Sequence, residues 1–462
     1  MTKKLAVVCS KIKGFPKKSR EVVIKVPEDH LFVALTAILD WSELIKIAVI
    51  RRSQVLKMPQ VGRRPHLREM LGVLVLRAIK SCTLQEAMDL ARHYAPARIL
   101  CGFIDENGMD SGMGPDFRTI SDFEILMGEE GIKQFNAIVL KAAAGLGFAD
   151  IKGLCSDTTA QEVAIPYPTE VGLMRSFTRS ILNGVKGLKG LSGSMKKKVE
   201  EIGDKIAKQV RKYRLFAATS EDKRKIGEVI LKDVVNLHGI AADLSEKIQN
   251  AKGKIAAKCS RFPNRLPGLL NTFSKLKPQI EYFLKHGTPC RNKIISLDMP
   301  EARSIPRGKD GKDCEFGFKW IINRIRNGYI WLSVNASLGN ANEFDCAVNA
   351  VKEHIAIFGV APAEFGYDRG GWSEEHIEKI KKLGVKRVAI APKGQAKWKV
   401  SDHCRTKMVR ERAQVEGSIG CLKRVGFNRP NSKNTQSVLR AGQRAALRLN
   451  LTKFVRDIRK AA

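Results

Sequence analysis

The stretch "EFGFKWIINRIRNGYIWLSVNAS" (residues 315–337) decides the fold, because it predicts two strands joined by a tight turn. Both halves are rich in β-branched and aromatic residues, and they meet at Asn327-Gly328. The two central positions of a type I′ turn need a positive φ, which asparagine and glycine adopt most readily. The stretch therefore predicts an antiparallel β-hairpin.

The residues after the hairpin predict strands that alternate with single helices. We expect helices over 342–359 and 373–384, and strands over 363–368 and 386–394. A helix between two strands of one sheet requires a parallel crossover, whereas the Asn-Gly turn requires an antiparallel pair. A mixed sheet follows from these local signals.

One more strand is expected well before the hairpin, in "GFADIKGLCSDTT" (147–159). A long helical insertion follows it at 171–290, and the strands resume from 291. Without the insertion, the order is strand, hairpin, helix, strand, helix, strand, helix. That is the order of a ribonuclease H-like domain, an α/β fold in which an antiparallel half continues into parallel strands.

Hydrophobic periodicity and charge divide the chain into six regions. The insertion has 25 Lys and Arg against 10 Asp and Glu, a net charge of +15, so its basic helices either face solvent or contact a DNA backbone. The predicted regions are a basic flexible leader (1–27), a helical N-terminal DNA-binding domain (28–148), the first strand region of the sheet domain (149–170), the basic helical insertion (171–290), the remainder of the sheet domain (291–425) and a basic helical C-terminal tail (426–462).

The N-terminal domain contains a pattern that is typical of two helices joined by a short turn. Thr83-x-x-Glu86 predicts a capping box that opens a new helix after a break at Lys80–Cys82. Beside "GRRP" (62–65), this pattern is compatible with a helix-turn-helix DNA reader. A plain helical bundle is the alternative.

The composition favours a polyanionic partner. The chain has 82 Lys and Arg against 47 Asp and Glu, a net charge of +35, and nucleic acid is the commonest polyanion. The ten cysteines form no C-x-x-C pair, so a structural zinc site is not expected and reduced thiols are. Because we find neither a signal peptide nor about 18 consecutive apolar residues, we expect a soluble intracellular protein.

Three acidic residues fall at informative places in the predicted order. Asp157 lies at the expected end of the first strand, Asp368 ends the strand after the first crossover helix, and Glu416 lies on the last helix. The two strands are neighbours in a ribonuclease H-like sheet, and a helix crossing their ends supplies the glutamate. Phosphodiester chemistry uses two hard cations roughly 3.5–4 Å apart, and carboxylates suit Mg²⁺.

The stretch "RERAQVEGSIGCLKRVGF" (410–427) surrounds the glutamate with bases. Arg412, Glu416 and Lys423 are separated by steps that place them within about 40° on one helix face. The alternative is an Arg–Glu surface pair, worth about 0.3–0.5 kcal/mol. Gly417 and Gly420 each cost about 1 kcal/mol in a helix, and close approach to the sheet or to a DNA backbone would explain them.

This R-x3-E-x6-K spacing resembles the Y-x2-R-x3-E-x6-K signature of DDE transposases of bacterial insertion sequences, with Val409 at the tyrosine position. "SDTT" resembles the first aspartate motif of that family, and "YDRGGWSEE" resembles the second. "GRRPHLREMLGVLVL…PDFRTISDF" looks like the helical N-terminal domain of these enzymes. The resemblance covers roughly 60–425 without the insertion, which matches no pattern of the family.

The resemblance implies a metal-binding triad of Asp157, Asp368 and Glu416, with two Mg²⁺ ions or Mn²⁺ in their place. Arg412 and Lys423 would hold phosphates of the DNA end. The implied enzyme is a DDE transposase that cleaves at transposon ends and transfers the freed 3′-OH to target DNA. Because Val409 stands where the family has tyrosine, the resemblance does not imply whether the reaction passes through a DNA hairpin intermediate.

The implied partners are double-stranded DNA, at terminal inverted repeats and target sites, and a second copy of the chain in a homodimer. The implied location is the prokaryotic cytoplasm, on nucleoid DNA and without a membrane. Two alternatives remain, namely a non-catalytic DNA-binding protein derived from a transposase and another ribonuclease H-like nuclease such as a junction resolvase.

Overall fold

A computed structural model describes most of the chain. Most of the predicted leader and all of "GRRP" (62–65) lie outside the described residues. The described residues are 5–6, 21–22, 26–56, 66–104, 112, 114–250, 256–257, 261–309, 312–334, 343–394, 396–432 and 434–461. Two short antiparallel pairs are formed by β1 (Leu5–Ala6) with β2 (Glu21–Val22) and by β4 (Leu188–Lys189) with β5 (Ala256–Ala257).

The N-terminal region is helical, as predicted. Its described helices are α1 (Leu31–Ile38), α2 (Trp41–Leu56), α3 (Leu67–Lys80), α4 (Leu84–His93), α5 (Ala95–Leu100) and α6 (Phe117–Gly145). α3 ends at Ser81, which has a φ of 56°. The Thr83 hydroxyl then accepts from the Glu86 N–H at 3.2 Å, and the Glu86 carboxylate accepts from the Thr83 N–H at 2.7 Å. The predicted break and capping box are therefore confirmed.

The predicted hairpin is present. β7 (Lys312–Arg326) and β8 (Ile330–Val334) pair antiparallel, with Ile322 opposite Leu332. The turn between them has positive φ at both Asn327 (72°) and Gly328 (95°), as the type I′ interpretation requires.

The hairpin belongs to an open mixed sheet, which has six strands within the described part of the chain. β3 (Asp150–Glu162) pairs antiparallel with β7 and parallel with β9 (Glu364–Tyr367), and β10 (Arg387–Ile390) continues parallel to β9. The order is β10-β9-β3-β7, with β8 and β6 (Arg303–Lys309) both paired to β7. The mixed sheet is confirmed, and β6 is an edge strand that the sequence did not predict.

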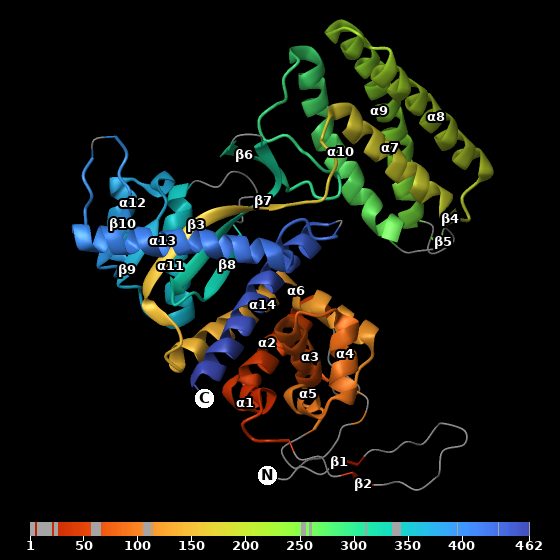
Figure 1. Cartoon of the computed structure of the whole chain (residues 1–462). Helices are drawn as coiled ribbons and strands as arrows, with labels where there is room; N and C mark the ends of the chain where they lie inside the picture. Colours follow the sequence, from red (N-terminus) through yellow and green to blue (C-terminus); the bar gives the residue numbers. More distant parts are fainter. Residues whose placement is uncertain are drawn as a thin grey trace.

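Helices cover both faces of this sheet (Figure 1). The connections around β9 and β10 are α11 (Glu343–Phe358), α12 (Glu374–Lys382) and α13 (Asp402–Leu422). On one face, Leu154 and Phe365 join the core that contains α11 residues, and on the other Cys155 and Ile322 pack with Met408 and Val415 of α13. The alternation of side chains along β3 thus separates two cores.

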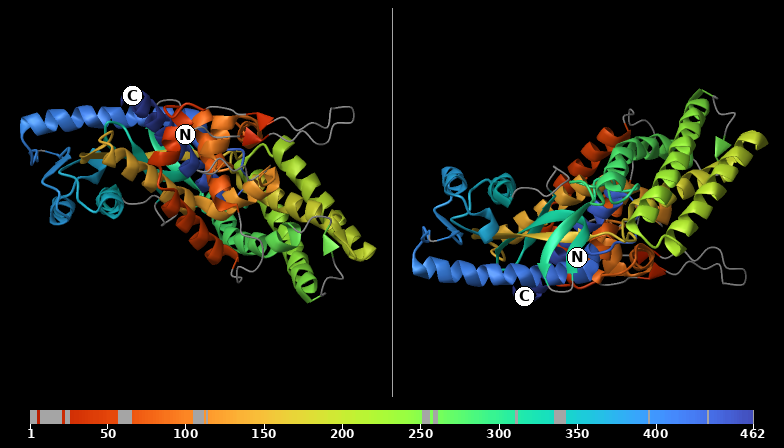
Figure 2. Two further views of the ribbon diagram at one scale, coloured as in Figure 1. Left: turned by 90° about the horizontal axis from the view of Figure 1, so that it is seen from below. Right: turned by 90° about the horizontal axis from the view of Figure 1, so that it is seen from above.

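The predicted helical insertion forms its own bundle between β3 and β6. Its helices are α7 (Glu170–Lys186), α8 (Gly193–Leu215), α9 (Ser220–Asn250) and α10 (Arg261–His286). They enclose a separate apolar core, in which the rings of Phe177 and Phe273 stack at 4.3 Å between centroids. Figures 1 and 2 show this bundle at the end of the sheet opposite to β10 and α12.

The C-terminal residues return to the N-terminal helices. A π-helical turn, η2 (Lys423–Phe427), leads to α14 (Thr435–Ala461), whose residues Leu451 and Phe454 are buried in the same core as α3 and α6. Asn450 adds a buried polar link, because it bonds both Asn136 of α6 and Ile330 of β8. Among the described helices, none combines the length and apolar character needed to cross a membrane.

Candidate functional site

The sheet places Asp157 in β3 and Asp368 directly after Tyr367, the last residue of the neighbouring parallel strand β9. Parallel pairing of β3 with β9 ends at Cys155 opposite Gly366, and Asp157 and Asp368 each lie two residues further along. Residues two apart in a strand point to the same face, and adjacent strands lie about 4.8 Å apart. The register therefore carries both aspartates to the same level on the face that α13 covers.

Asp157 does not end its strand, so that part of the prediction is wrong. β3 continues to Glu162, because Thr158 to Glu162 pair with Ile321 to Gly317 of β7. The fifteen-residue length of β7 extends the antiparallel ladder past the aspartate. Asp157 is consequently a mid-strand residue, half-buried, whose carboxylate accepts from the Thr158 N–H at 2.7 Å.

α13 lies closely over this pair of strands. A Cβ placed on Gly366 would meet Cys155 Sγ and Met408 Cε, each at 3.0 Å, so the helix packs where β9 has no side chain. Met408 and Val415 of α13 are buried on the side of the helix that faces the sheet. The helix axis therefore passes across the strands that carry Asp157 and Asp368, as Figures 1 and 2 also show.

Arg412 joins α13 to the second aspartate. Its Nη2 lies 2.8 Å from Asp368 Oδ1, and the two side chains are 34% and 43% exposed. Asp368 also accepts from the Arg369 N–H at 2.7 Å, which caps the 3-10 turn η1 (Arg369–Gly371). The Arg412 Nε is buried and has no hydrogen-bond partner among the described residues, so one guanidinium donor is left unsatisfied.

Glu416 lies one turn beyond Arg412 on the same side of α13, as predicted. It is exposed, and it makes no hydrogen bond or ion pair with a residue that the structure describes. The surface pair between Arg412 and Glu416, the alternative considered from the sequence, is not formed. Within the described ranges no three His, Cys, Asp or Glu side chains are grouped closely enough to hold a metal ion. The sheet register thus puts the two aspartates at the same level, and Glu416 on α13 makes no hydrogen bond or ion pair with either of them.

The remaining predicted positions lie along the same helix. Lys423 follows the last residue of α13, is half-buried, and still has helical φ and ψ, so its predicted alignment with Arg412 holds. Val409, at the position of the family's tyrosine, is 53% exposed. A Cβ added to Gly417 or Gly420 would meet no atom within 4 Å. Close approach to the sheet therefore does not explain these glycines, and that explanation is wrong.

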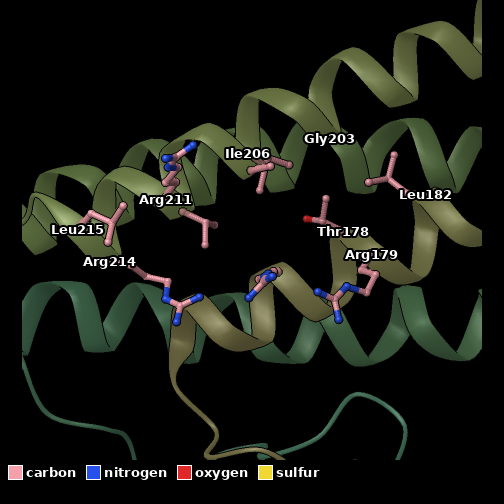
Figure 3. Close-up of a pocket in the computed structure, with 11 residues that line it drawn as sticks. Thr178, Arg179, Leu182, Gly203, Ile206, Arg211, Arg214 and Leu215 are labelled. Carbon is pink, nitrogen blue, oxygen red and sulfur yellow. The ribbon is translucent and has the colours of Figure 1, made fainter.

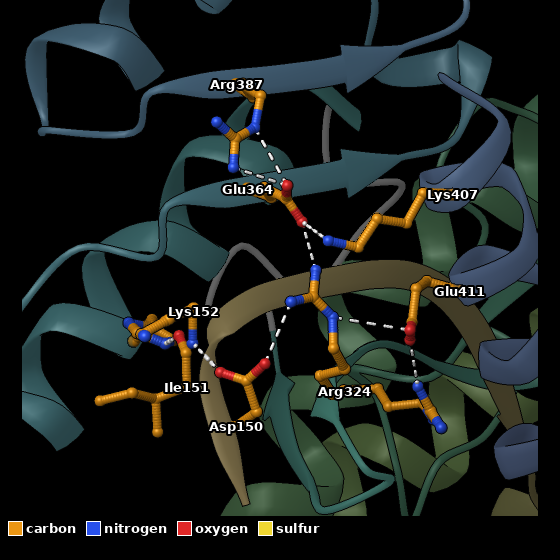
Figure 4. A network of polar contacts seen from close by, with 10 residues as sticks. Asp150, Ile151, Lys152, Arg324, Glu364, Arg387, Lys407 and Glu411 are labelled. Atoms are coloured by element: carbon orange, nitrogen blue, oxygen red, sulfur yellow. Dashed lines mark hydrogen bonds and ion pairs between the residues drawn. The ribbon is translucent and has the colours of Figure 1, made fainter. Parts of the chain in front are cut away.

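A buried ion network fixes α13 against the sheet at the other end of β9 (Figure 4). Glu364 is 4% exposed, and its carboxylate accepts from Arg387 at 2.7 Å, Lys407 of α13 at 3.0 Å, and Arg326. Burial raises the pKa of Glu364, but the hydrogen bonds from Lys407, Arg387 and Arg326 outweigh it and lower the pKa to about 2. The carboxylate therefore stays ionised and ties three strands to one helix.

The network extends along α13 through Glu411. This carboxylate lies 3.0 Å from Arg324 Nη1 and 3.6 Å from Arg326 Nε, and Arg326 also pairs with Asp150 at 3.0 Å. None of these residues was predicted from the sequence to hold the helix in place. One signal was available, because Arg324 and Arg326 are two apart in a predicted strand and so share a face. Together these contacts set the position of the helix that carries Arg412 and Glu416.

The predicted DNA-reading role of the N-terminal helix pair stays a prediction. α3 is buried along most of its length. The exposed positions of α4, the second helix of the pair, include Glu86 and Asp89. Two carboxylates on that face would repel phosphates in a DNA groove. Basic residues are present at the last turns of the two helices, namely Arg77 and Lys80 of α3 and Arg92 and His93 of α4.

Comparisons with known proteins add no assignment: no family model, no curated protein and no solved structure matches the chain. The site is accordingly interpreted from its own geometry and chemistry.

Proposed function

We propose that the protein is a DNA transposase whose ribonuclease H-like domain cuts and joins phosphodiesters with Asp157, Asp368 and Glu416. One observation carries the proposal: Asp157 in β3 and Asp368, the residue after the adjacent parallel strand β9, lie at the same level of the sheet, under a helix from which Arg412 pairs with Asp368. The strand order β8-β7-β3-β9-β10, with an antiparallel half and parallel crossovers, supports the ribonuclease H-like assignment.

The donor set fits Mg²⁺, because all three side chains offer carboxylate oxygens. Asp157 and Asp368 would hold the ions from the strands, and Glu416 would complete the set from α13. Bound Mg²⁺, or Mn²⁺ in its place, would supply an activated water and stabilise the leaving oxygen. Glu416 is exposed and one helical turn from Arg412, so a change of its side-chain rotamer is the adjustment that the proposal requires.

Arg412 has two tasks in this mechanism. In the structure it neutralises Asp368, which limits repulsion between the neighbouring carboxylates. Its side chain is 34% exposed, and the exposed part of the guanidinium provides a donor for a phosphate oxygen of the DNA end. Lys423, farther along the same helix, would contact a second phosphate. Their shared face keeps the scissile phosphate between base and carboxylate.

The proposed reaction is cleavage at the transposon end by water, followed by attack of the freed 3′-OH on target DNA. The proposed partners are double-stranded DNA and, because two ends must be joined, a second copy of the chain. The proposed location is the prokaryotic cytoplasm.

The test is cleavage of an oligonucleotide that carries a terminal inverted repeat taken from the DNA flanking the gene, with Mg²⁺ or Mn²⁺. We expect Asp157→Asn, Asp368→Asn and Glu416→Gln each to lower cleavage at least about 100-fold while DNA binding persists, since metal stabilisation of the transition state amounts to several kcal/mol. The matched control is Asp402→Asn, an exposed acid at the start of α13 that pairs only locally with Arg405.

Three outcomes would contradict the assignment. If all three variants cut like the wild type, the triad is wrong. If the wild type binds the end but never cuts, the chain is a non-catalytic DNA-binding protein. If it cuts branched junctions and ignores the repeat, it is another ribonuclease H-like nuclease.

A further inference from the structure

The helical insertion contains an arginine-lined groove between α7 and α8 (Figure 3). The groove has a volume of about 550 Å³. Its apolar floor includes Ile206 and Val210, and one end is closed where α8 approaches α7 so tightly that a Cβ on Gly203 would meet Leu182 at 2.7 Å. The groove is therefore a feature of the helix pair and not of one side-chain rotamer.

Four guanidinium groups border this groove, two from each helix. Arg175 and Arg179 come from α7, and Arg211 and Arg214 come from α8. All four are exposed, none forms an ion pair with a described residue, and the lining residues include no aspartate or glutamate. Like charges facing one another over an apolar floor repel, so the arrangement lowers the stability of the bundle unless an anion lies between them.

We propose that this groove binds the phosphodiester backbone of double-stranded DNA, at a site separate from the carboxylates. Guanidinium groups bind phosphate oxygens through paired hydrogen bonds, which makes arginine the favoured residue for this contact. Arg175 and Arg179 are about 6 Å apart along α7, and Arg211 and Arg214 about 4.5 Å apart along α8. These intervals span one or two phosphates of a strand, which follow every ~3.4 Å along the duplex axis.

The charge of the whole insertion favours DNA over a short acidic peptide. Residues 171–290 have a net charge of +15, so the attractive field extends well beyond the four arginines. A long polyanion such as DNA is attracted by the charges of the whole insertion, whereas a short peptide would contact only the residues of the groove.

The position of the groove allows it to contact the same duplex as the proposed active site. Thr169, the N-cap of α7, is the twelfth residue after Asp157, and twelve steps of fully extended chain span at most about 43 Å. That is little more than one turn of DNA. The groove therefore binds DNA flanking the cleavage point, an inference that rests on the proposed DNA partner but not on the carboxylate chemistry.

The experiment uses the full chain and a fluorescent duplex of about 30 bp and arbitrary sequence, with anisotropy measured over a series of salt concentrations. The groove variant replaces all four arginines with glutamine. Its matched control makes the same change in charge on exposed lysines of the bundle outside the groove, which are Lys223, Lys232, Lys247 and Lys275. Both variants lose four positive charges, so a loss of binding that came from net charge alone would be equal in the two.

We expect the groove variant to bind at least about tenfold more weakly at ~150 mM salt, with the slope of log affinity against log salt reduced by about 3–4. The control should change this slope by less than about 1. The thermal midpoint of the groove variant without DNA should equal or exceed that of the wild type, because repulsion is removed. The proposal would be overturned if the groove variant bound DNA as tightly as the wild type does, or if the groove variant and the control lost DNA affinity equally.

Two further measurements keep the result decisive. If the fourfold variant fails to fold, Arg179→Gln and Arg211→Gln singly should each reduce the slope by about 1. If the groove variant loses binding to polyglutamate but not to DNA, the groove binds acidic protein and the proposal is wrong. If the wild type shows no cleavage activity, the transposase proposal is contradicted, but this comparison of salt slopes still tests DNA binding by the groove.

Discussion

Replacement of Glu364 by glutamine should destabilise the protein and remove part of its sensitivity to acid. The carboxylate is buried and accepts from Arg387 at 2.7 Å and from Lys407 at 3.0 Å, with Arg326 as a third partner. Glutamine has nearly the same shape but no charge, so the change tests the charge of the network and not its packing.

The size of the effect follows from the pKa. The pKa of Glu364 is lowered from 4.5 to about 2, a difference of about 2.5, because the three hydrogen-bonded cations outweigh the effect of burial. At about 1.36 kcal/mol per pKa unit, the ionised carboxylate contributes about 3 kcal/mol to the free energy of unfolding. Breaking a buried ion pair typically costs about 3–5 kcal/mol. Because Arg387 and Lys407 are partly exposed and can be rehydrated, we expect a loss of about 2–3 kcal/mol at pH 7.

The pH dependence has a definite sign. A lowered pKa in the folded state gives stability that is complete above pH 4.5 and is lost as the pH falls toward 2. Urea unfolding of both proteins should therefore show a difference that is constant near neutrality and shrinks below about pH 4.5. The control is Glu378→Gln, an exposed acid of α12 that pairs only with Lys381, which should leave the midpoint unchanged. Equal midpoints for wild type and Glu364→Gln at pH 7 would refute the argument.

Two other changes test the packing of the chain and the exposed side of α13. Asn450→Ala should lower the free energy of unfolding, measured in urea, by about 1–3 kcal/mol, because it leaves the buried Ile330 N–H without its acceptor. The control is Asn271→Ala on the surface of α10, which should change this free energy little. Equal effects of the two substitutions would contradict the prediction. Gly417→Ala should stabilise the protein by up to about 1 kcal/mol, as should Gly239→Ala in α9, because neither Cβ meets an atom within 4 Å. Only Gly417→Ala should also weaken DNA-end binding, and unchanged binding would show that no DNA backbone approaches there.

Much of the sheet was predictable because its signals are local. Asn327-Gly328 specifies an antiparallel turn, and single helices between strands specify parallel crossovers. β6 was missed because Pro306 interrupts its pattern, and proline is tolerated only where a strand lies at an edge. The length of β3 was underestimated for a related reason, since it depends on the length of its partner β7. Pairing between distant segments is not visible in either segment alone.

The site was predictable only in part. Element order alone brings Asp157 beside Asp368, because it determines which strands are neighbours. The burial of Glu364 was not predictable, since its partners come from β7, β10 and α13, and the sequence around it, "AEFGYD", has no feature that distinguishes it from a solvated strand end. The lack of a partner for Glu416 was also not predictable, because helical periodicity gives the side of the helix on which a residue lies but not which residues its side chain contacts.

The two ends of the α13 contact differ in a way that bears on function. At Glu364 and Glu411 every carboxylate on the helix–sheet boundary has cationic partners, so the helix is held firmly there. Local rules would then predict an Arg412–Glu416 pair on the exposed side. Instead Arg412 reaches across to Asp368, and Glu416 has no ion-pair partner among the described residues. A helix that only covered the sheet would gain stability by pairing its own charges. The observed arrangement gives up that pairing at the level of the sheet where Asp157 and Asp368 lie on neighbouring segments, and departures of this kind from local consistency are expected at functional sites.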